Sequence, residues 1–219
     1  RPIASGFFLM RKNYIWKLPR ASIELGSRTA IMGILNLTPD SFSDGGLYND
    51  PEHALDRALE IEAEGADILD VGGQSTRPGS GPVSAGEEAQ RVIPLLERIA
   101  SAIKIPISID TYHAEVAGLA MAAGAQIIND ISGFRMDPEM VTVARNTGAG
   151  VVLMHSRGGR EAIHVQTAGE GPDTIRAELI ETAARAVKNG IAPEAIVLDP
   201  GIGFSKDRET SLKVLKRLD

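Results

Sequence analysis

Polar side chains end several short apolar runs in this sequence. Asp110, Asn129, Asp130, His155 and Asp199 each close a run rich in Ile, Val or Leu. Because a buried polar group needs a partner, each of them could simply bind loop amides or cap the next helix. If Asp110, Asn129 and Asp199 instead meet at one rim, they offer acceptor atoms to a ligand whose edge carries N–H and NH2 donors, such as a 2-aminopyrimidinone.

Two polar loops earlier in the chain are further candidates for chemistry. The loop 38–46 carries Asp44 among hydroxyls, Pro and Gly, which suits an acidic lid, although a solvated turn has the same composition. The loop 72–81 sets Thr76 and Arg77 among glycines, a combination that binds anions. A helix-start loop with a single Arg has the same appearance, so composition leaves both readings open.

The elements that must position these residues follow a regular alternation. Short runs rich in β-branched residues alternate with stretches of helical period, as in βα units around a parallel sheet. Strands are expected at 30–37, 68–73, 106–111, 127–132, 150–155 and 195–201. Helices are expected at 51–65, 84–103, 113–123, 137–146, 172–189 and 205–218, the second opening with a Ser84–Glu87 capping box. Segments 13–18 and 21–25 are expected to form a small hairpin.

Two architectures fit such units, an open doubly wound sheet and a closed barrel. A dinucleotide-binding open sheet calls for G-x-G-x-x-G after its first strand, whereas residues 36–46 read NLTPDSFSDGG. Polar residues recur instead at the end of nearly every strand, which favours a barrel with its substrate over the strand tips. No linker or repeat interrupts the series, so one domain is expected.

The remaining candidates have weaker support. His53 and His113 lie near helix starts and are expected at the surface, and His164 falls in an irregular stretch. No Cys/His cluster or H-E-x-x-H supports a zinc site. Asp67 and Asp70 flank the start of one strand; Asp67 is expected to face out and Asp70 to face the strand tips as a support for the loops.

Composition limits the class of protein. The 219 residues, 43% hydrophobic, can bury a substantial core. The net charge of −6 without any Lys/Arg stripe argues against a nucleic-acid partner. The absence of Cys removes disulfides and thiolate chemistry. No apolar run is long enough for a membrane span, so a cytoplasmic protein is expected.

Six motifs together resemble one family. Residues 31–46, IMGILNLTPDSFSDGG, and 66–79, ADILDVGGQSTRPG, are similar to the two signatures of dihydropteroate synthases. PISIDT, IINDISG, VVLMH and LDPGIGF follow in the family's order and spacing. The resemblance covers residues 13–219, which are expected to form the pterin-binding barrel domain, with 1–12 as an N-terminal extension.

The resemblance implies a (β/α)8 barrel that joins 7,8-dihydropterin-6-ylmethyl diphosphate to 4-aminobenzoate and releases diphosphate. It implies that Asp110, Asn129 and Asp199 hold the aminopyrimidinone edge of the pterin and that Met154 packs on the ring. It further implies that Asn36 binds the Mg2+ that accompanies the diphosphate.

The resemblance also assigns roles in the loops. Asp44 faces the positive charge that develops on the pterin methylene, and Arg77 assists departure of the diphosphate. Thr76 and Arg77 order the second loop and help to bind the diphosphate and aminobenzoate. Phe204 lines the aminobenzoate pocket. A homodimer is implied for the full-length protein, with no nucleic-acid or membrane partner.

Several positions depart from the family's pattern. Gln74 stands where Glu is usual, Ser205 replaces a usual Gly, and residues 156–159 differ from the common sequence. The chain ends at Asp219 in the sixth helix, so only about six of eight βα units are expected. A pterin-binding methyltransferase module and a non-catalytic homologue are the alternatives, and the acidic first loop and STRPG speak against the former.

Overall fold

The computed structural model describes residues 12–37, 51–74, 81, 83–158, 165 and 171–218. At its centre lies a parallel sheet of six strands that are hydrogen-bonded in chain order. The strands are β3 (Met32–Asn36), β4 (Ile68–Gly72), β5 (Ile107–Asp110), β6 (Ile127–Asp130), β7 (Gly150–Met154) and β8 (Ile196–Asp199). All six predicted strands are confirmed, each shorter by one or two residues at one or both ends.

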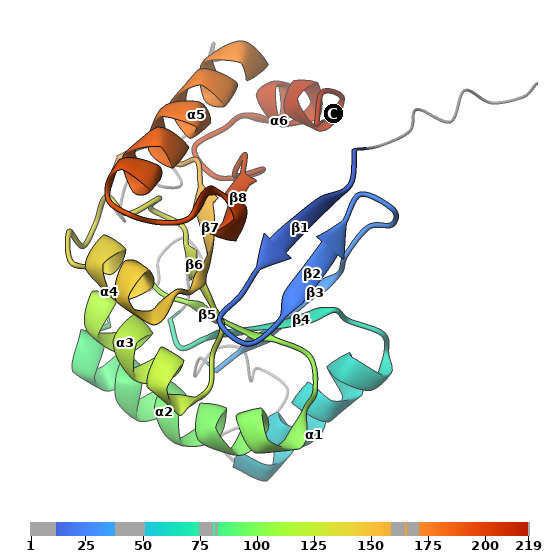
Figure 1. Ribbon diagram of the computed structural model, residues 1–219, viewed down its shortest axis with the longest axis vertical. Coiled ribbons are helices and arrows are strands. Elements are labelled where there is room, and N and C mark those ends of the chain that lie inside the picture. Colours follow the sequence, from blue (N-terminus) through green and yellow to red (C-terminus); the bar gives the residue numbers. More distant parts are fainter. Residues whose placement is uncertain are drawn as a thin grey trace, which may run out of the picture.

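A helix follows each strand, and Figure 1 shows the helices arranged around the outside of the sheet. They are α1 (Pro51–Ala63), α2 (Ala85–Ala102), α3 (Ala114–Ala123), α4 (Met140–Thr147), α5 (Pro172–Lys188) and α6 (Arg208–Leu215), with a short 3-10 turn, η3 (Pro193–Ala195), before β8. The helical stretches expected from the sequence are therefore confirmed in number and order.

Strand order decides between the two candidate architectures. A doubly wound sheet reverses its strand order at a switch point and carries helices on both faces. Here the order runs from β3 to β8 without reversal, and the helices cover one face only (Figure 1). The sheet is therefore part of a (β/α) barrel, as the distribution of polar strand ends predicts.

Successive residues of each strand point alternately to the helices and to the barrel interior. Leu69 and Val71 of β4 are fully buried in the large core between sheet and helices. Ile68, on the same strand, packs in a smaller core inside the barrel. Asp70 and Gly72 share the face of Ile68 and therefore point into the barrel interior.

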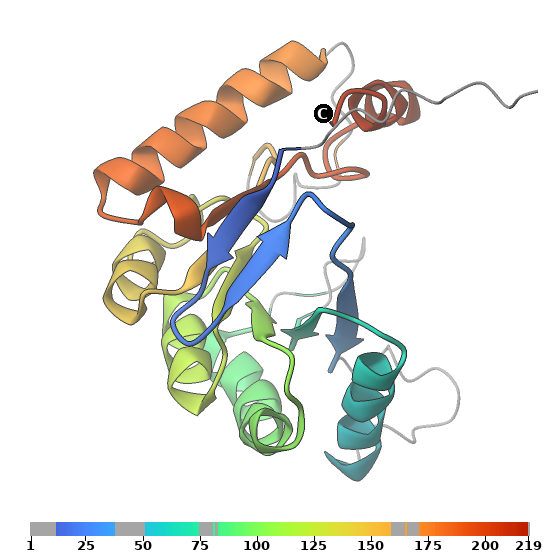
Figure 2. The same ribbon diagram turned by 45° about the vertical axis from the view of Figure 1, so that its right-hand side comes forward.

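The predicted hairpin, β1 (Tyr14–Lys17) and β2 (Ser22–Leu25), lies against the amino ends of the strands (Figure 2). The indole Nε1 of Trp16 donates a 2.8 Å hydrogen bond to the carbonyl of Ala195, just before β8. The carboxyl ends of the strands lie on the other side, so any site at the strand tips faces away from the hairpin.

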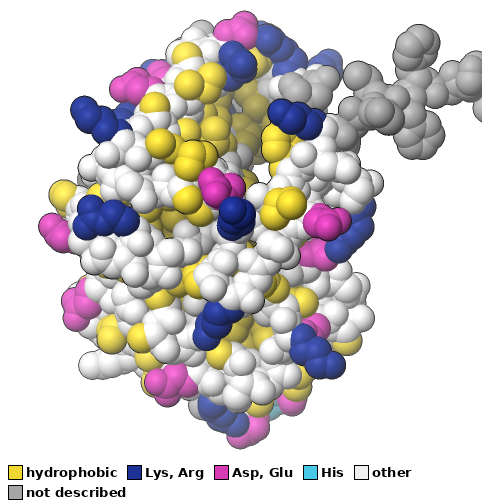
Figure 3. Space-filling view, viewed as in Figure 1, with side chains coloured by type: hydrophobic (Ala, Val, Ile, Leu, Met, Phe, Trp, Pro, Cys, Tyr) yellow, Lys and Arg dark blue, Asp and Glu magenta, His cyan; other side chains and the backbone are white. Residues whose placement is uncertain are grey.

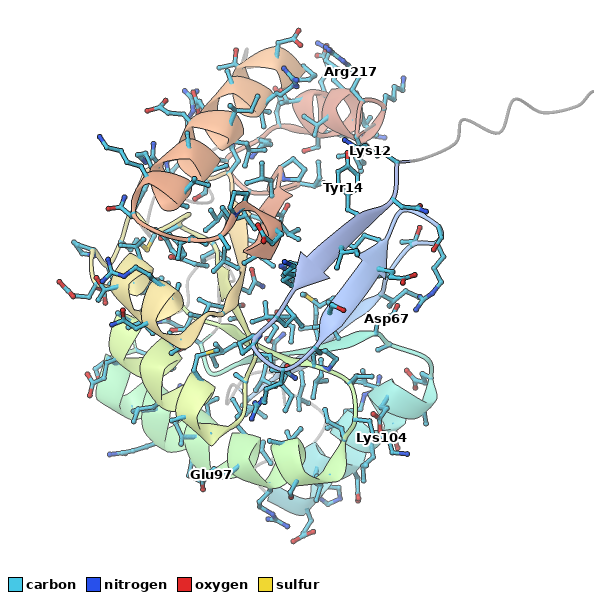
Figure 4. All side chains as sticks on the ribbon, in the orientation of Figure 1. Lys12, Tyr14, Asp67, Glu97, Lys104 and Arg217 are labelled. Carbon is cyan, nitrogen blue, oxygen red and sulfur yellow. The ribbon has the colours of Figure 1, made fainter. Side chains whose placement is uncertain are left out.

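Asp67 lies at the amino end of β4, near the hairpin (Figure 4). It accepts hydrogen bonds from the Arg28 guanidinium, 2.7 Å from Nη1, and from the Ile31 amide at 2.8 Å. The bond from Arg28 lowers the pKa of Asp67 to about 2. Asp67 was expected to face out; its side chain is 16% exposed and is paired with Arg28 at the amino end of the strand.

Side-chain hydrogen bonds to backbone amides mark the starts of α2, α4 and α6. Ser84 and Glu87 form the predicted capping box at the start of α2. Helix α4 begins at Met140 rather than at Asp137, because the Asp137 carboxylate binds the backbone amides of Ala114 and Glu139. Helix α6 begins after Asp207, whose carboxylate accepts from the Thr210 amide at 2.7 Å.

Charge is mixed on the surface. Figure 3 shows Lys and Arg interspersed with Asp and Glu on the hairpin side, without a stripe of one sign. Within the part of the chain that the structure describes, no helix is both long and apolar enough to cross a bilayer.

Candidate functional site

Residues at the carboxyl ends of four neighbouring strands lie in one row of the sheet. Asn36 of β3 pairs with Gly72 of β4, Gly72 with Asp110 of β5, and Asp110 with Asn129 of β6. Residues of one row in a parallel sheet point to the same face. The side chains of Asn36, Asp110 and Asn129 are thus neighbours over the barrel interior, at the end away from the hairpin.

Gly72 leaves a gap in this row that its neighbours use. A Cβ atom at Gly72 would lie 3.2 Å from the Asn36 Oδ1 atom and 3.5 Å from the Asp110 Oδ2 atom. Two side-chain oxygens from β3 and β5 therefore converge on the space above a residue without a side chain. Oxygen atoms in such an arrangement suit a hard cation or a ligand with N–H donors.

Asp70 lies below the row and is joined to it. Its side chain is 4% exposed, and its Oδ2 atom accepts a 3.1 Å hydrogen bond from the Asn129 amide nitrogen. Burial raises the pKa of Asp70, while hydrogen bonds from Ser108 and Asn129 oppose the rise. Asp70 faces the strand tips as expected, but its hydrogen bond goes to a strand residue, Asn129, and not to a loop.

The Asp110 carboxyl lies among other acids. Burial raises its pKa well above the ordinary value, and the charges of Asp70, Glu88 and Asp130 raise it further. A ligand that brings N–H donors or a positive charge relieves this unfavourable field, whereas an anionic group would add to it. Strongly shifted acids at strand tips are typical of functional sites.

An apolar wall adjoins the polar row. Met154, at the end of β7, is 4% exposed and packs with Tyr112 and Ile131. Phe204 and Met136 are partly buried against the same cluster. A flat aromatic ligand could therefore meet acceptors at its edge and apolar side chains on its face.

Asp199 ends β8 beside Met154, its register partner. Its Oδ1 atom accepts a 2.7 Å hydrogen bond from the Gly201 amide, which orients the carboxyl. Gly201 has a φ of +66°, and a Cβ there would lie 2.2 Å from the His155 carbonyl oxygen. The buried Lys206, which sequence reasoning missed, donates to the carbonyls of His155 and Phe204 and holds the same loop.

The other two polar strand ends, Asp130 and His155, have partners outside the row. Asp130 faces away from Asn129 and accepts from the amides of Ser132 at 2.7 Å and Phe134 at 3.0 Å. The His155 Nε2 atom lies 2.8 Å from the Glu178 carboxylate on α5. For Asp130 the alternative stated from sequence, binding to loop amides, is therefore correct, whereas His155 contacts a side chain of a helix instead.

Glu88, in the first turn of α2, is a buried acid that sequence reasoning missed. It is 0% exposed, and within the described residues neither carboxyl oxygen makes a hydrogen bond of good geometry. Burial raises its pKa to about 7, opposed by the Thr111 hydroxyl and the charge of Arg91. The Nε2 atom of His113 lies 3.9 Å away. The available signal was its position on the stripe of Val92, Leu95 and Ile99.

Three predicted site residues lie outside the described residues. They are Asp44 in the first loop and Thr76 and Arg77 in the second. His164 is also outside them. The described candidates, Asn36, Asp110, Asn129, Met154, Asp199 and Phe204, all lie at or beyond the carboxyl ends of strands.

The sequence matches one known family over most of its length. The profile described as "Pterin binding enzyme" matches residues 32–219. The chain is 46% identical over 199 residues to a dihydropteroate synthase of Bacillus subtilis (strain 168), an alignment that covers 91% of this chain and 68% of that protein.

Solved structures give the same result. The chain is similar to a Xanthomonas albilineans dihydropteroate synthase with 4-aminobenzoic acid, with a TM-score of 0.85 at 36% identity, covering 94% of this chain and 73% of that one. It is also similar to a Burkholderia cenocepacia dihydropteroate synthase complexed with 7,8-dihydropteroate, with a TM-score of 0.82 at 38% identity, covering 94% and 70%.

Proposed function

This chain belongs to the dihydropteroate synthase family of pterin binding enzymes. On that premise we propose that the polar row at the strand tips, which contains Asp110 and Asn129, is part of the pterin site. The function is the synthase reaction, which joins 7,8-dihydropterin-6-ylmethyl diphosphate to 4-aminobenzoate and releases diphosphate. The observation that carries the assignment of the site is the register row that brings Asp110 and Asn129 together above Asp70.

The row and its wall match the two properties of a pterin. Asp110, Asn129 and Asp199 supply acceptors for the N–H and NH2 groups of the aminopyrimidinone edge. Met154 packs on the ring face, and Phe204, which contacts the same apolar cluster, lines the space for 4-aminobenzoate. Burial and neighbouring acids raise the pKa of Asp110, and hydrogen bonds from ring N–H donors would lower it again by stabilising the charged form.

The reaction itself needs positioning more than a strong base. The C–O bond to the diphosphate breaks with its electron pair on the leaving group, and a C–N bond forms to the arylamine, which loses a proton. Asp44 stabilises positive charge on the pterin methylene, and Thr76 and Arg77 bind the departing diphosphate. These three roles remain proposals that come from the family pattern.

The described residues fit a Mg2+ ion that arrives with the substrate. Among them, no group of three or more His, Cys, Asp or Glu side chains could hold a metal unaided. Mg2+ typically takes few protein oxygens and completes its shell with waters and substrate phosphates. The Asn36 Oδ1 atom beside Gly72 is such an oxygen, so Asn36 would hold the ion, which supplies charge for the diphosphate.

Replacing Asn36 by alanine is expected to abolish the Mg2+-dependent part of diphosphate binding. The affinity for the pterin diphosphate in Mg2+ should fall at least about 10-fold, because a metal ligand is lost. The affinity for 6-hydroxymethylpterin, which has no diphosphate, should not change. Titration calorimetry with both compounds, in Mg2+ and in EDTA, measures this; an equal loss for both would contradict the assignment of Asn36 to the metal.

Binding of the pterin diphosphate to this chain tests the proposed site directly. Titration calorimetry should show one site per chain, and addition of 4-aminobenzoate should release diphosphate at a measurable rate. Absence of binding at millimolar ligand by a folded protein would rule out the proposal. We also propose that the protein works in the cytoplasm and as a homodimer. Sedimentation analysis can check the dimer.

A further inference from the structure

Asp70 is a buried acid for which the proposed reaction has no use. It is on β4, and its Oδ2 atom accepts a hydrogen bond from Asn129 on β6, 59 residues further along the chain. Strand β5 lies between β4 and β6, so this bond reaches past a whole strand through the barrel interior. A buried bond between residues so far apart in sequence fixes a specific side-chain arrangement.

The bond determines how the Asn129 amide is oriented. The oxygen and nitrogen of an asparagine amide are nearly alike in shape, so its hydrogen-bond partners decide which one faces which way. Asp70 accepts through Oδ2, which requires the NH2 group of Asn129 to face Asp70. The Oδ1 atom of Asn129 and the second N–H are then left for whatever lies over the row.

This orientation holds when Asp70 is a carboxylate and also when its proton is on Oδ1. The Oδ1 atom of Asp70 is buried and receives no hydrogen bond of good geometry from the described residues. A proton on that atom leaves Oδ2 an acceptor, as in the carboxylate. Ser108, the register partner of Asp70, places a buried hydroxyl on the same face.

We propose that Asp70 is a positioning residue that turns the Asn129 oxygen toward the ligand, so that the site selects rings with an amino group over rings with a carbonyl there. This inference rests on the proposed pterin site and adds the source of its selectivity. In a ring with a carbonyl in place of the 2-amino group, the carbonyl oxygen would face the Asn129 oxygen. Both atoms are acceptors, so no hydrogen bond could form between them and binding would be weaker.

The test is the ratio of affinities for 6-hydroxymethylpterin and its 2,4-dioxo analogue. In D70N the new amide can donate as well as accept, so both orientations of Asn129 become available. The preference for the amino ring should fall at least about 10-fold. D67N is the matched control, since it makes the same Asp-to-Asn change at the other end of β4. This variant should keep the wild-type ratio of affinities.

A second variant and a direct measurement guard against misfolding. D70S is smaller than the native residue and its hydroxyl also donates and accepts, so it should lose the preference in the same way; thermal unfolding checks both proteins. In the NMR spectrum of the unaltered protein, one side-chain amide proton of Asn129 should be shifted strongly downfield. Random-coil chemical shifts for both of these protons would contradict the hydrogen bond. A wild type that binds neither ring refutes the pterin site, whereas an unchanged ratio in a folded D70N or D70S overturns the role of Asp70 alone.

Discussion

D110N is expected to weaken binding of the pterin substrate by about 100-fold while leaving the fold intact. A carboxylate that accepts from ring N–H groups becomes an amide whose NH2 can face them, so a charge-assisted bond is lost and donors oppose each other. Bonds to charged groups contribute about 1.5–3 kcal/mol each, and every 1.4 kcal/mol is tenfold in affinity. Titration calorimetry measures the loss.

The same substitution should not destabilise the protein. Because burial and the nearby Asp70, Glu88 and Asp130 raise the pKa of Asp110, its ionisation opposes folding, and stability is lost as pH rises through the folded pKa. An uncharged asparagine removes that cost, so D110N should be at least as stable as wild type in alkaline buffer. A large drop in melting temperature together with unchanged pterin affinity would show that Asp110 is structural instead.

The strand tips were predictable because apolar runs end where buried strands end. Parallel strands carry their carboxyl ends to one edge, so Asp110 and Asn129 could be placed at one rim from sequence. The hydrophobic pattern alone could not separate Asn129 from Asp130, since a shift of one residue turns a side chain to the opposite face, and the choice of Asn129 came from the family resemblance. The register with β5 decides that Asn129 joins the row and Asp130 binds loop amides.

Contacts between distant strands and helices were beyond reach of the sequence. The bond from Asn129 to Asp70 depends on barrel curvature, and the burial of Glu88 depends on how α2 packs against the sheet. Ser205 is a partial exception. It stands where the family usually has Gly, and the structure gives it a φ of +51°, a left-handed conformation that favours glycine. The preference for Gly was visible in the family pattern, but its reason is visible only in the backbone.

The pH dependence of stability should change most when Glu88 is replaced by glutamine. Burial raises the pKa of Glu88 to about 7 from an ordinary value of 4.5. An acid whose folded pKa is raised gives full stability below its unfolded pKa and loses it as pH rises, so wild type should weaken between about pH 5 and pH 8. The difference corresponds to roughly 3 kcal/mol above pH 8. E88Q cannot ionise and should lack this decline.

Urea unfolding of both proteins from pH 5 to pH 9 measures the effect as a difference in slope, which cancels any fixed cost of the new amide. E88M, which is apolar and of similar length, should flatten the curve in the same way. E87Q is the matched control, because the exposed Glu87 has its pKa lowered by the Ser84 amide and is ionised throughout this range. Its stability should therefore fall with pH as in wild type. Parallel curves for wild type and E88Q would mean that Glu88 stays charged when buried, with its charge balanced by His113 or Arg91.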